Sequence, residues 1–204
     1  MLLDKSHGMQ AASTAIGAPM GAGFVAAAAP GRRFERLDAR EIPIVRHQMA
    51  FAARTRLAPV ASMMTVLGNG WIYLLLGLTL VLIEGWRATG TILRAGIAVA
   101  VGHGIYACGK RFVARPRPHV TYADIAPRRV PLDCYSFPSG HCMTICAACL
   151  PIAVAHPVAG LALAPLVLGL AWSRVVVGHH YPSDVVAGAL LGVAACLPVM
   201  LLPL

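Results

Sequence analysis

Long apolar stretches alternate with short polar segments through most of this 204-residue chain. The pattern delimits apolar stretches at 57–83, 91–108, 139–155, 158–177 and 184–202. Each is long enough, or nearly so, for an α-helix to cross the hydrocarbon core of a bilayer, which takes about 20 apolar residues. The alternation therefore predicts an all-α, polytopic membrane helical bundle with about five transmembrane helices, or six if a segment near the N-terminus also crosses.

The chain before the first stretch divides into two segments of different composition. Residues 1–30 are rich in alanine and glycine, and we expect a flexible or weakly apolar leader there. Residues 31–56 carry seven arginines, and their apolar side chains recur at near-helical spacing. This combination predicts an amphipathic interfacial helix, with a solvated charged linker as the alternative. The membrane domain would comprise residues 57–204, with a bend or a lead-in helix at the Gly-Asn-Gly sequence 68–70.

Composition favours a membrane protein and argues against nucleic acid as a partner. Hydrophobic residues make up 58% of the sequence and charged residues only 12%, about half the share that is typical of soluble domains. The mean hydropathy is +0.71. The formal net charge is +9, but the basic residues gather in two blocks beside apolar stretches. Anionic membrane lipids or a phosphate-bearing substrate explain that distribution better than nucleic acid does.

Counting the stretches places the main polar segments on one face of the membrane. The large polar loop at 109–138 and the segment 173–184 are separated by two apolar stretches, which a tight turn at 156–157 joins. If both stretches cross, the loop and the segment lie on the same face. Between residue 130 and the C-terminus, the only charged side chains are those of Asp133, Arg174 and Asp184. Because charge is costly at membrane depth and is usually retained for function, we expect a functional site on this face.

Three clusters of polar residues would meet there. They are Lys110 with Arg117-Pro118, then Pro138-Ser139-Gly140-His141, then Ser173-Arg174 followed by His180 and Asp184. Lysine and arginine side chains bind phosphate, as do the free N–H groups at a helix N-terminus, so the clusters predict a phosphoryl-transfer site. The sequence offers no cluster of carboxylates to hold Mg²⁺, and we expect neither a metal nor a cofactor.

The third cluster contains a reactive pair. We expect Ser183 to be the N-cap of a new helix and Asp184 to lie in its first turn, where the carboxylate reaches back to His180. Asp184 would fix the tautomer of His180 and stabilise the positive charge that develops when this histidine attacks phosphorus. His141 would be the general acid for the leaving oxygen, and later the base that activates water. His179 is expected to point elsewhere, as a surface or hydrogen-bonding residue.

Taken together and in order, these motifs resemble the three-part signature of the type 2 phosphatidic acid phosphatase superfamily. The resemblance covers about residues 99–204 and includes each motif in full, and the first half looks like the short bacterial members. It implies an all-helical membrane fold and metal-independent removal of phosphate from lipid phosphates or diphosphates. It also implies that His141, His180 and Asp184 carry out the chemistry. The residues that it implies for phosphate binding are Lys110, Arg117, Ser139, Gly140 and Arg174.

The resulting hypothesis is an integral membrane phosphatase that acts on a lipid phosphate through a phosphohistidine intermediate. Candidate substrates are polyprenyl diphosphates, phosphatidate and phosphatidylglycerophosphate, since a generic apolar groove does not distinguish them. The alternatives are a phosphotransferase that passes the phosphoryl group to another lipid or a sugar, and a non-catalytic lipid-phosphate binder or transporter. The motifs also resemble those of vanadium haloperoxidases, but those are soluble, and the apolar stretches argue against that reading.

Two arguments disagree about which side of the membrane holds the site. Counted as they stand, the basic residues of 31–56 and 109–138 place this face in the cytoplasm by the positive-inside rule. The cations that bind phosphate do not belong in that count, and the family resemblance favours an extracytoplasmic site. We therefore expect the site outside the cytoplasm, where Cys108 and Cys134, on either side of the polar loop, could also pair.

Overall fold

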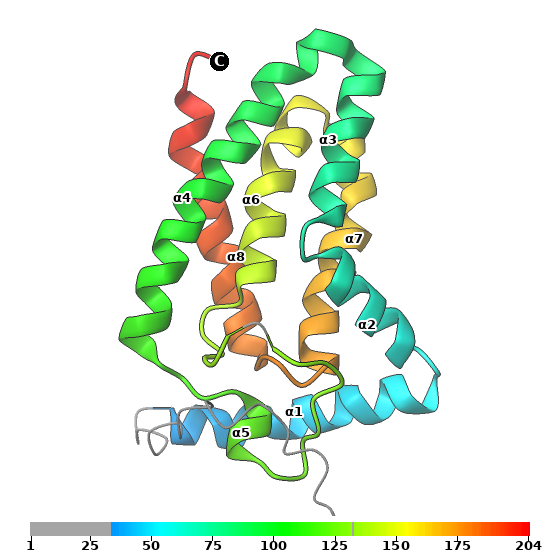
Figure 1. Cartoon of the computed structure of the whole chain (residues 1–204), viewed down its shortest axis with the longest axis vertical. Helices are drawn as coiled ribbons and strands as arrows, with labels where there is room; N and C mark the ends of the chain where they lie inside the picture. Colours follow the sequence, from blue (N-terminus) through cyan, green and yellow to red (C-terminus); the bar gives the residue numbers. More distant parts are fainter. Residues whose placement is uncertain (1–33, 132) are drawn as a thin grey trace, which may run out of the picture.

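The structure is a computed structural model that describes residues 34–131 and 133–204. Within these ranges the chain is helical and has no β-strand beyond a single bridge between Pro116 and Tyr135. Helices along the long axis of the molecule (Figure 1) are α3 (Trp71–Glu84), α4 (Thr89–Val113), α6 (Gly140–Ala155), α7 (Pro157–Val176) and α8 (Pro182–Cys196). α1 (Glu35–Arg54) lies across one end of this bundle, beside the short α5 (Pro118–Thr121). The predicted all-α bundle is confirmed.

Among the described residues, three helical segments have the length and composition of membrane spans. α3 and α4 are joined by the 3₁₀ turn η1 (Gly85–Ala88) into 43 helical residues, Trp71–Val113, that are apolar enough to cross a membrane. The segments Pro157–Val176 and Pro182–Leu201 are also long and apolar enough to cross a membrane, whereas α2 (Ala58–Leu67) and α6 are shorter apolar helices. Large exposed apolar side chains are frequent on these helices, as lipid contact requires: Leu74, Leu78, Leu82, Leu161, Leu168 and Leu190.

The first predicted stretch consists of two helices with a tight turn between them. α2 ends at Leu67 and α3 begins at Trp71, so the bend expected at the Gly-Asn-Gly sequence is confirmed. Gly70 has a φ of +149°, which glycine adopts far more readily than other residues. A Cβ at Gly68 would lie 2.8 Å from the ring of His141, so the turn passes directly against the start of α6.

α6 is the central helix and contacts α4, α7 and α8. Two glycines on α8 set how closely it approaches α6. A Cβ at Gly188 would lie 2.3 Å from the carbonyl oxygen of Ser139, and one at Gly192 would lie 2.3 Å from that of Met143. Because small residues let helix backbones approach each other, these glycines hold the starts of α6 and α8 together. Two of the three predicted motifs lie at those starts.

α1 is the amphipathic helix predicted within 31–56, and one of its faces is buried against the bundle. Its buried residues are Asp38, Glu41, Ile42, Val45 and Ala52. The helix contacts α2, α7 and α8, and on its outer side Arg46 pairs with Asp124 of the polar loop at 2.7 Å. Its location in the membrane interface stays a prediction. The leader expected at 1–30 lies outside the described residues.

Candidate active site

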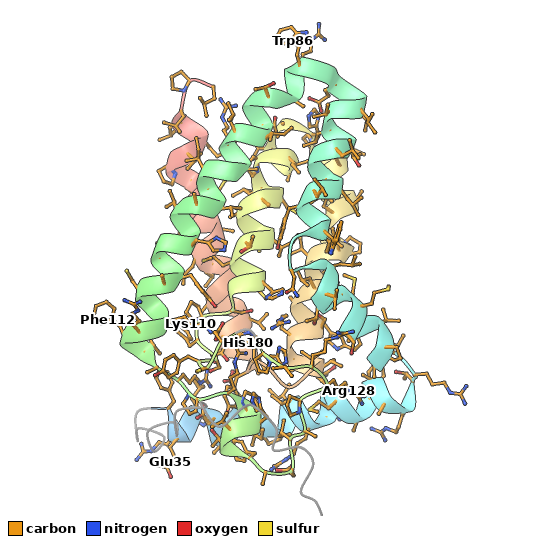
Figure 2. All side chains as sticks on the ribbon, viewed as in Figure 1. Glu35, Trp86, Lys110, Phe112, Arg128 and His180 are labelled. Carbon is orange, nitrogen blue, oxygen red and sulfur yellow. The ribbon has the colours of Figure 1, made fainter. Side chains whose placement is uncertain are left out.

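The predicted motifs come together at the end of the bundle where α1 lies. Figure 2 shows Lys110, His180 and Arg128 at this end, and Trp86 at the opposite one. The Nη1 group of Arg117 donates a hydrogen bond of 2.7 Å to the carbonyl of His179. This contact joins the polar loop to the segment after α7, so the two lie at the same end of the bundle, as the predicted common membrane face requires.

A sharp reversal of the chain between α7 and α8 places His180. α7 ends at Val176, and Gly178 has a φ of +76° in the turn that follows. The N–H groups of His179 and His180 both donate to the carbonyl of Arg174, each at 3.2 Å. His180 is thereby folded back against Arg174, and only 2% of its surface is exposed.

Asp184 lies behind His180 as predicted, but the helix that carries it begins earlier than expected. Tyr181 is the N-cap of α8 and Pro182 its first residue, so the prediction of Ser183 as N-cap is wrong. Proline suits this position because its fixed φ is helical and its missing N–H needs no partner there. The Oδ2 atom of Asp184 accepts the N–H of Tyr181 at 2.9 Å and lies 3.7 Å from Nδ1 of His180.

The surroundings of His180 keep its imidazole neutral. Burial lowers the pKa of His180 well below its usual 6.5, and the cations Arg117 and Arg174 lower it further. The Nε2 atom of the ring lies 3.4 Å from Nη1 of Arg117. A neutral ring is the form that a nucleophile requires, and Asp184 is placed to balance charge that develops on it.

Lys110 and Arg117 share a carboxylate that no motif marks. The Oδ1 atom of Asp133 lies 2.8 Å from Nζ of Lys110 and 2.7 Å from Nη2 of Arg117. The hydroxyl of Tyr106 donates to Oδ2 of the same carboxylate at 2.6 Å, and Lys110 also donates to the carbonyl of Tyr135. Burial alone would raise the pKa of Asp133, but Arg117 and Lys110 outweigh this effect and lower it to about 2. Asp133 is therefore ionised and holds both cations in place.

Arg174 points hydrogen-bond donors at the site. Its Nη2 atom lies 2.8 Å from Nδ1 of His179, whose Nε2 lies 2.7 Å from the carbonyl of Arg129. His179 is therefore a buried hydrogen-bonding residue that orients Arg174, not a surface residue. The Nε and Nη1 atoms of Arg174 are buried, and neither has a hydrogen-bond partner within the described part of the chain. Because buried polar groups are normally hydrogen-bonded, these two donors fit an anion.

The N-terminus of α6 completes the arrangement. Ser139 is its N-cap, and the N–H of Ser139 donates to the carbonyl of Asp184 at 3.0 Å. A Cβ at Gly140 would lie 2.8 Å from the ring of Tyr106, so a glycine fits there. His141 follows, with its Nε2 atom 2.7 Å from Oδ1 of Asn69. Asn69 supports the ring of His141, although its sequence position marks only a bend.

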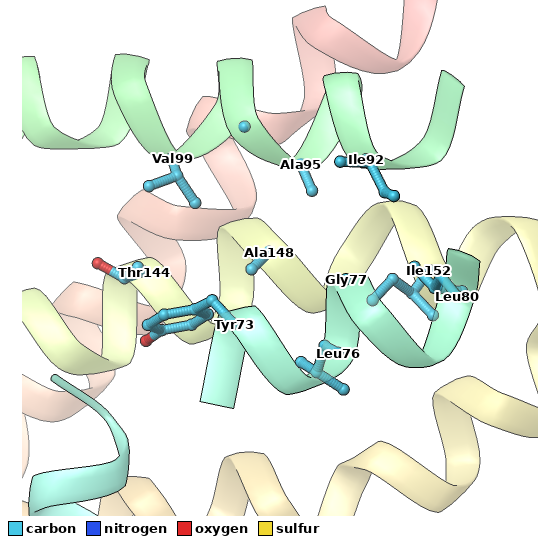
Figure 3. A pocket seen from close by; sticks show the side chains of 11 residues that line it. Tyr73, Leu76, Gly77, Leu80, Ile92, Ala95, Val99, Thr144, Ala148 and Ile152 are labelled. Carbon is cyan, nitrogen blue, oxygen red and sulfur yellow. The ribbon is translucent and has the colours of Figure 1, made fainter. Parts of the chain in front are cut away.

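His141 stands between a polar pocket and an apolar one. The polar pocket, about 370 Å³, is lined by Asn69, His141 and Arg174, with the exposed Arg128 and Arg129 in its wall. Asn69 and His141 also line a second pocket of about 340 Å³. This one shares its wall residues Tyr73, Val99 and Thr144 with a third, about 260 Å³, which lies between α3, α4 and α6 and is almost wholly apolar (Figure 3). The pockets lead from Arg174 past His141 into the apolar interior of the bundle.

The cysteines and acidic residues provide no metal centre within the described ranges. Among those residues, no group of three or more His, Cys, Asp or Glu side chains is placed to hold a metal ion. Cys108 and Cys134 are exposed, unbonded thiols, so the disulfide that the sequence leaves open is not formed. Cys142 and Cys149 are buried in the helix packing around α6, as expected for small apolar residues.

Known proteins with similar sequences are named as phosphatases of lipid-linked phosphates. The decaprenylphosphoryl-5-phosphoribose phosphatase of Mycobacterium tuberculosis is 41% identical over 102 residues, which cover 49% of this chain and 54% of that protein. The lipid A 1-phosphatase of Rhizobium etli is 44% identical over 57 residues, 28% of this chain and 25% of the relative. The chain thus spans about half, or less, of the length of the curated relatives that it matches.

Two solved structures have a similar fold. LpxE of Aquifex aeolicus superposes with a TM-score of 0.67 at 20% identity, over 78% of this chain and 94% of LpxE. The PAP2 type phosphatidylglycerolphosphate phosphatase of Bacillus subtilis superposes with a TM-score of 0.52 at 22% identity, over 82% and 90% of the two chains. The family model of the PAP2 superfamily matches residues 88–203, more than half of the sequence and all three motifs. The chain therefore belongs to the PAP2 superfamily.

Proposed function

We propose that this protein is an integral membrane phosphatase that removes phosphate from a lipid phosphate or diphosphate through a phosphohistidine on His180. The observation that carries the proposal is the buried, neutral imidazole of His180, with Asp184 3.7 Å behind its Nδ1 and two arginines around it. Membership of a superfamily that contains lipid phosphatases supports the reaction class.

Transfer of the phosphoryl group to the enzyme is the first step. The substrate phosphate is bound by the three buried cations and by the N–H groups at the start of α6. The Nε2 atom of His180 attacks phosphorus and forms a P–N bond while the bond to the lipid oxygen breaks. His141, protonated once the negative charge of the bound phosphate faces its ring, donates this proton to the leaving oxygen, and the carboxylate of Asp184 stabilises the positive charge on the His180 ring.

Hydrolysis of the phosphohistidine is the second step. His141, which has lost its proton, accepts one from a water molecule as that water attacks phosphorus. The P–N bond breaks, its electron pair returns to Nε2 of His180, and inorganic phosphate leaves. Asn69, 2.7 Å from Nε2 of His141, keeps the ring of this acid and base in place through both steps.

The substrate would place its headgroup in the polar pocket and its chain in the apolar one. The series of pockets that begins at His141 favours a lipid over a soluble phosphate, because the pocket between α3, α4 and α6 at its far end is almost wholly apolar. Polyprenyl diphosphates, phosphatidate and phosphatidylglycerophosphate are candidates. The names of the relatives add two further candidate substrates, decaprenylphosphoryl-5-phosphoribose and the 1-phosphate of lipid A. Arg128 and Arg129, in the wall of the polar pocket, suit such anionic headgroups.

Catalysis is expected to proceed without a metal ion. Purified protein should release phosphate from at least one of these lipids in detergent with EDTA present, and vanadate, which mimics five-coordinate phosphorus, should inhibit it. Loss of activity on chelation, restored by Mg²⁺, would contradict this mechanism. Appearance of phosphate on an added lipid or sugar acceptor would identify a phosphotransferase instead. Binding of every lipid without turnover would identify a non-catalytic binder or transporter.

We further propose that the site faces the extracytoplasmic side of a multi-pass membrane protein, with α1 in the interface on that side. The test is Ala123→Cys, at an exposed position of the polar loop, in a variant without the native cysteines. A membrane-impermeant maleimide should label the introduced thiol in intact cells. Labelling only after lysis would place the site in the cytoplasm.

A further inference from the structure

The buried face of α1 carries two carboxylates. Asp38 and Glu41 point into the bundle together with Ile42 and Val45, and they are only 3% and 8% exposed. Burying a carboxylate is costly unless it is paired and hydrogen-bonded. Both of these are paired with one residue, Arg115, which lies after α4 and is 1% exposed.

Arg115 connects α1 to the reactive pair. Its Nε and Nη2 atoms donate to Oδ1 of Asp38 at 2.9 and 2.7 Å, and Nη2 also donates to Oε2 of Glu41 at 2.7 Å. Its Nη1 atom donates to Oδ1 of Asp184 at 2.6 Å. One edge of the guanidinium is thus held by α1, while the remaining nitrogen donates to Asp184 and, at 2.7 Å, to the hydroxyl of Ser183. The ring of Tyr181, 4.1 Å from the guanidinium carbon, covers one of its flat sides.

These contacts determine which oxygen of Asp184 faces His180. Because Oδ1 is bound to Arg115, Oδ2 is the oxygen that accepts the N–H of Tyr181 and lies nearest Nδ1 of His180. Glu41 fixes the same turn of α8 from outside. Its Oε1 accepts the N–H of Ser183 and its Oε2 accepts the Ser183 hydroxyl, both at 2.7 Å. A carboxylate of α1 therefore binds one of the N–H groups that a helix N-terminus leaves without an intrahelical partner.

We propose that Arg115, held by Asp38 and Glu41, is a positioning residue that aims Asp184 at His180, and that α1 thereby belongs to the catalytic apparatus. This inference rests on the proposed function. The competing explanation is that the ion pairs only attach α1 to the bundle. The two explanations differ in what the substitution of Arg115 lowers: a positioning role lowers kcat only while an aspartate occupies position 184, whereas attachment lowers the stability of the fold.

The test is a double-mutant cycle between Arg115→Gln and Asp184→Asn. In each variant, kcat and KM are measured, together with the rate of phosphate release in a single turnover. Arg115→Gln alone should lower kcat by about 10- to 100-fold, with KM changed less than about threefold, because a misaimed supporting group slows chemistry more than binding. In the Asp184→Asn background, the same substitution should cost nothing further, as for residues that act as one unit. Multiplying losses in the double variant would overturn the proposal.

Two further variants complete the experiment. Glu41→Gln keeps an oxygen for the N–H of Ser183 but removes one charge from Arg115, and it replaces Arg115→Gln in the cycle if that variant does not fold. Arg46→Gln breaks the other ion pair between α1 and the loop, an exposed one that does not reach Asp184, and should leave kcat unchanged. An equal loss of kcat in Arg46→Gln would favour simple attachment. If the unmodified protein hydrolyses no lipid phosphate, the proposed function has failed, which is a different result from multiplying losses.

Discussion

Replacement of His180 by alanine is expected to lower kcat by about 10⁶-fold, the size of loss seen when a covalent nucleophile is removed from a hydrolase. The adjacent histidine is not placed to substitute for it. The neighbouring His179 has both ring nitrogens engaged, one with Arg174 and one with a backbone carbonyl. The measurement is phosphate release from the best lipid substrate by purified protein in detergent.

A matched variant separates loss of the nucleophile from loss of the fold. His47 lies on the exposed side of α1, away from the bundle, so His47→Ala should retain full turnover. Both variants should elute as the unmodified protein does in size-exclusion chromatography. Turnover by His180→Ala within about 100-fold of the unmodified protein would rule out His180 as the nucleophile, because that loss is within the range of a general acid or base.

Asp184→Asn is expected to lower kcat by about 10⁴-fold, by analogy with the loss of the aspartate from a serine-protease triad. An amide at this position cannot balance the positive charge on His180 during transfer. It would also leave the guanidinium of Arg115 facing a neutral group in a buried site, where Asp184 now accepts its Nη1 donor at 2.6 Å. The measurement is the rate of the first turnover, with a thermal melt as a check on folding.

The outcome of this substitution also distinguishes two roles for Asp184. The same carboxylate accepts the N–H of Tyr181, so it stabilises the first turn of α8 as well. If Asp184→Asn lowered the melting temperature but kept kcat within about tenfold, Asp184 would be a helix cap and not part of the chemistry. An unchanged melt with a large loss of kcat would fit the proposed role.

The sequence predicts the helical bundle and the convergence of its motifs well, because both follow from apolar length. Spans of about 20 residues fix how often the chain crosses, and the crossings bring Lys110, Arg117 and His180 to one end. The tight turn at 68–70 is also predicted, because its two glycines are typical of turns. The exact start of α8 is not, because Ser183 looks like an N-cap until Pro182 is recognised as the first helical residue.

Arg115 and its carboxylate partners are harder to predict from the sequence. α1 contains many charges, and a charged helix is usually read as solvated or as bound to lipid headgroups. The signal is the spacing: Asp38 and Glu41 fall on the same helical face as Ile42 and Val45, which points carboxylates toward the core. Their partner lies 77 residues away from Asp38, and no local pattern links the two.

Asp133 shows a different limit of the sequence. It is one of only three charges after residue 130, so its presence signals function, but its spacing from Lys110 and Arg117 is set by an irregular loop. Only the fold reveals that its carboxylate holds both cations.

The central claim is tested most directly by trapping the covalent intermediate. Purified protein is mixed with a lipid substrate that carries labelled phosphate, quenched in alkali within the first turnover, digested and mapped by mass spectrometry. The account predicts a phosphoryl group, stable to alkali and labile to acid, on the peptide that contains His180, formed at least as fast as kcat. Steady turnover without any phosphorylated peptide, or a phosphoryl group on His141 or another residue, would contradict it.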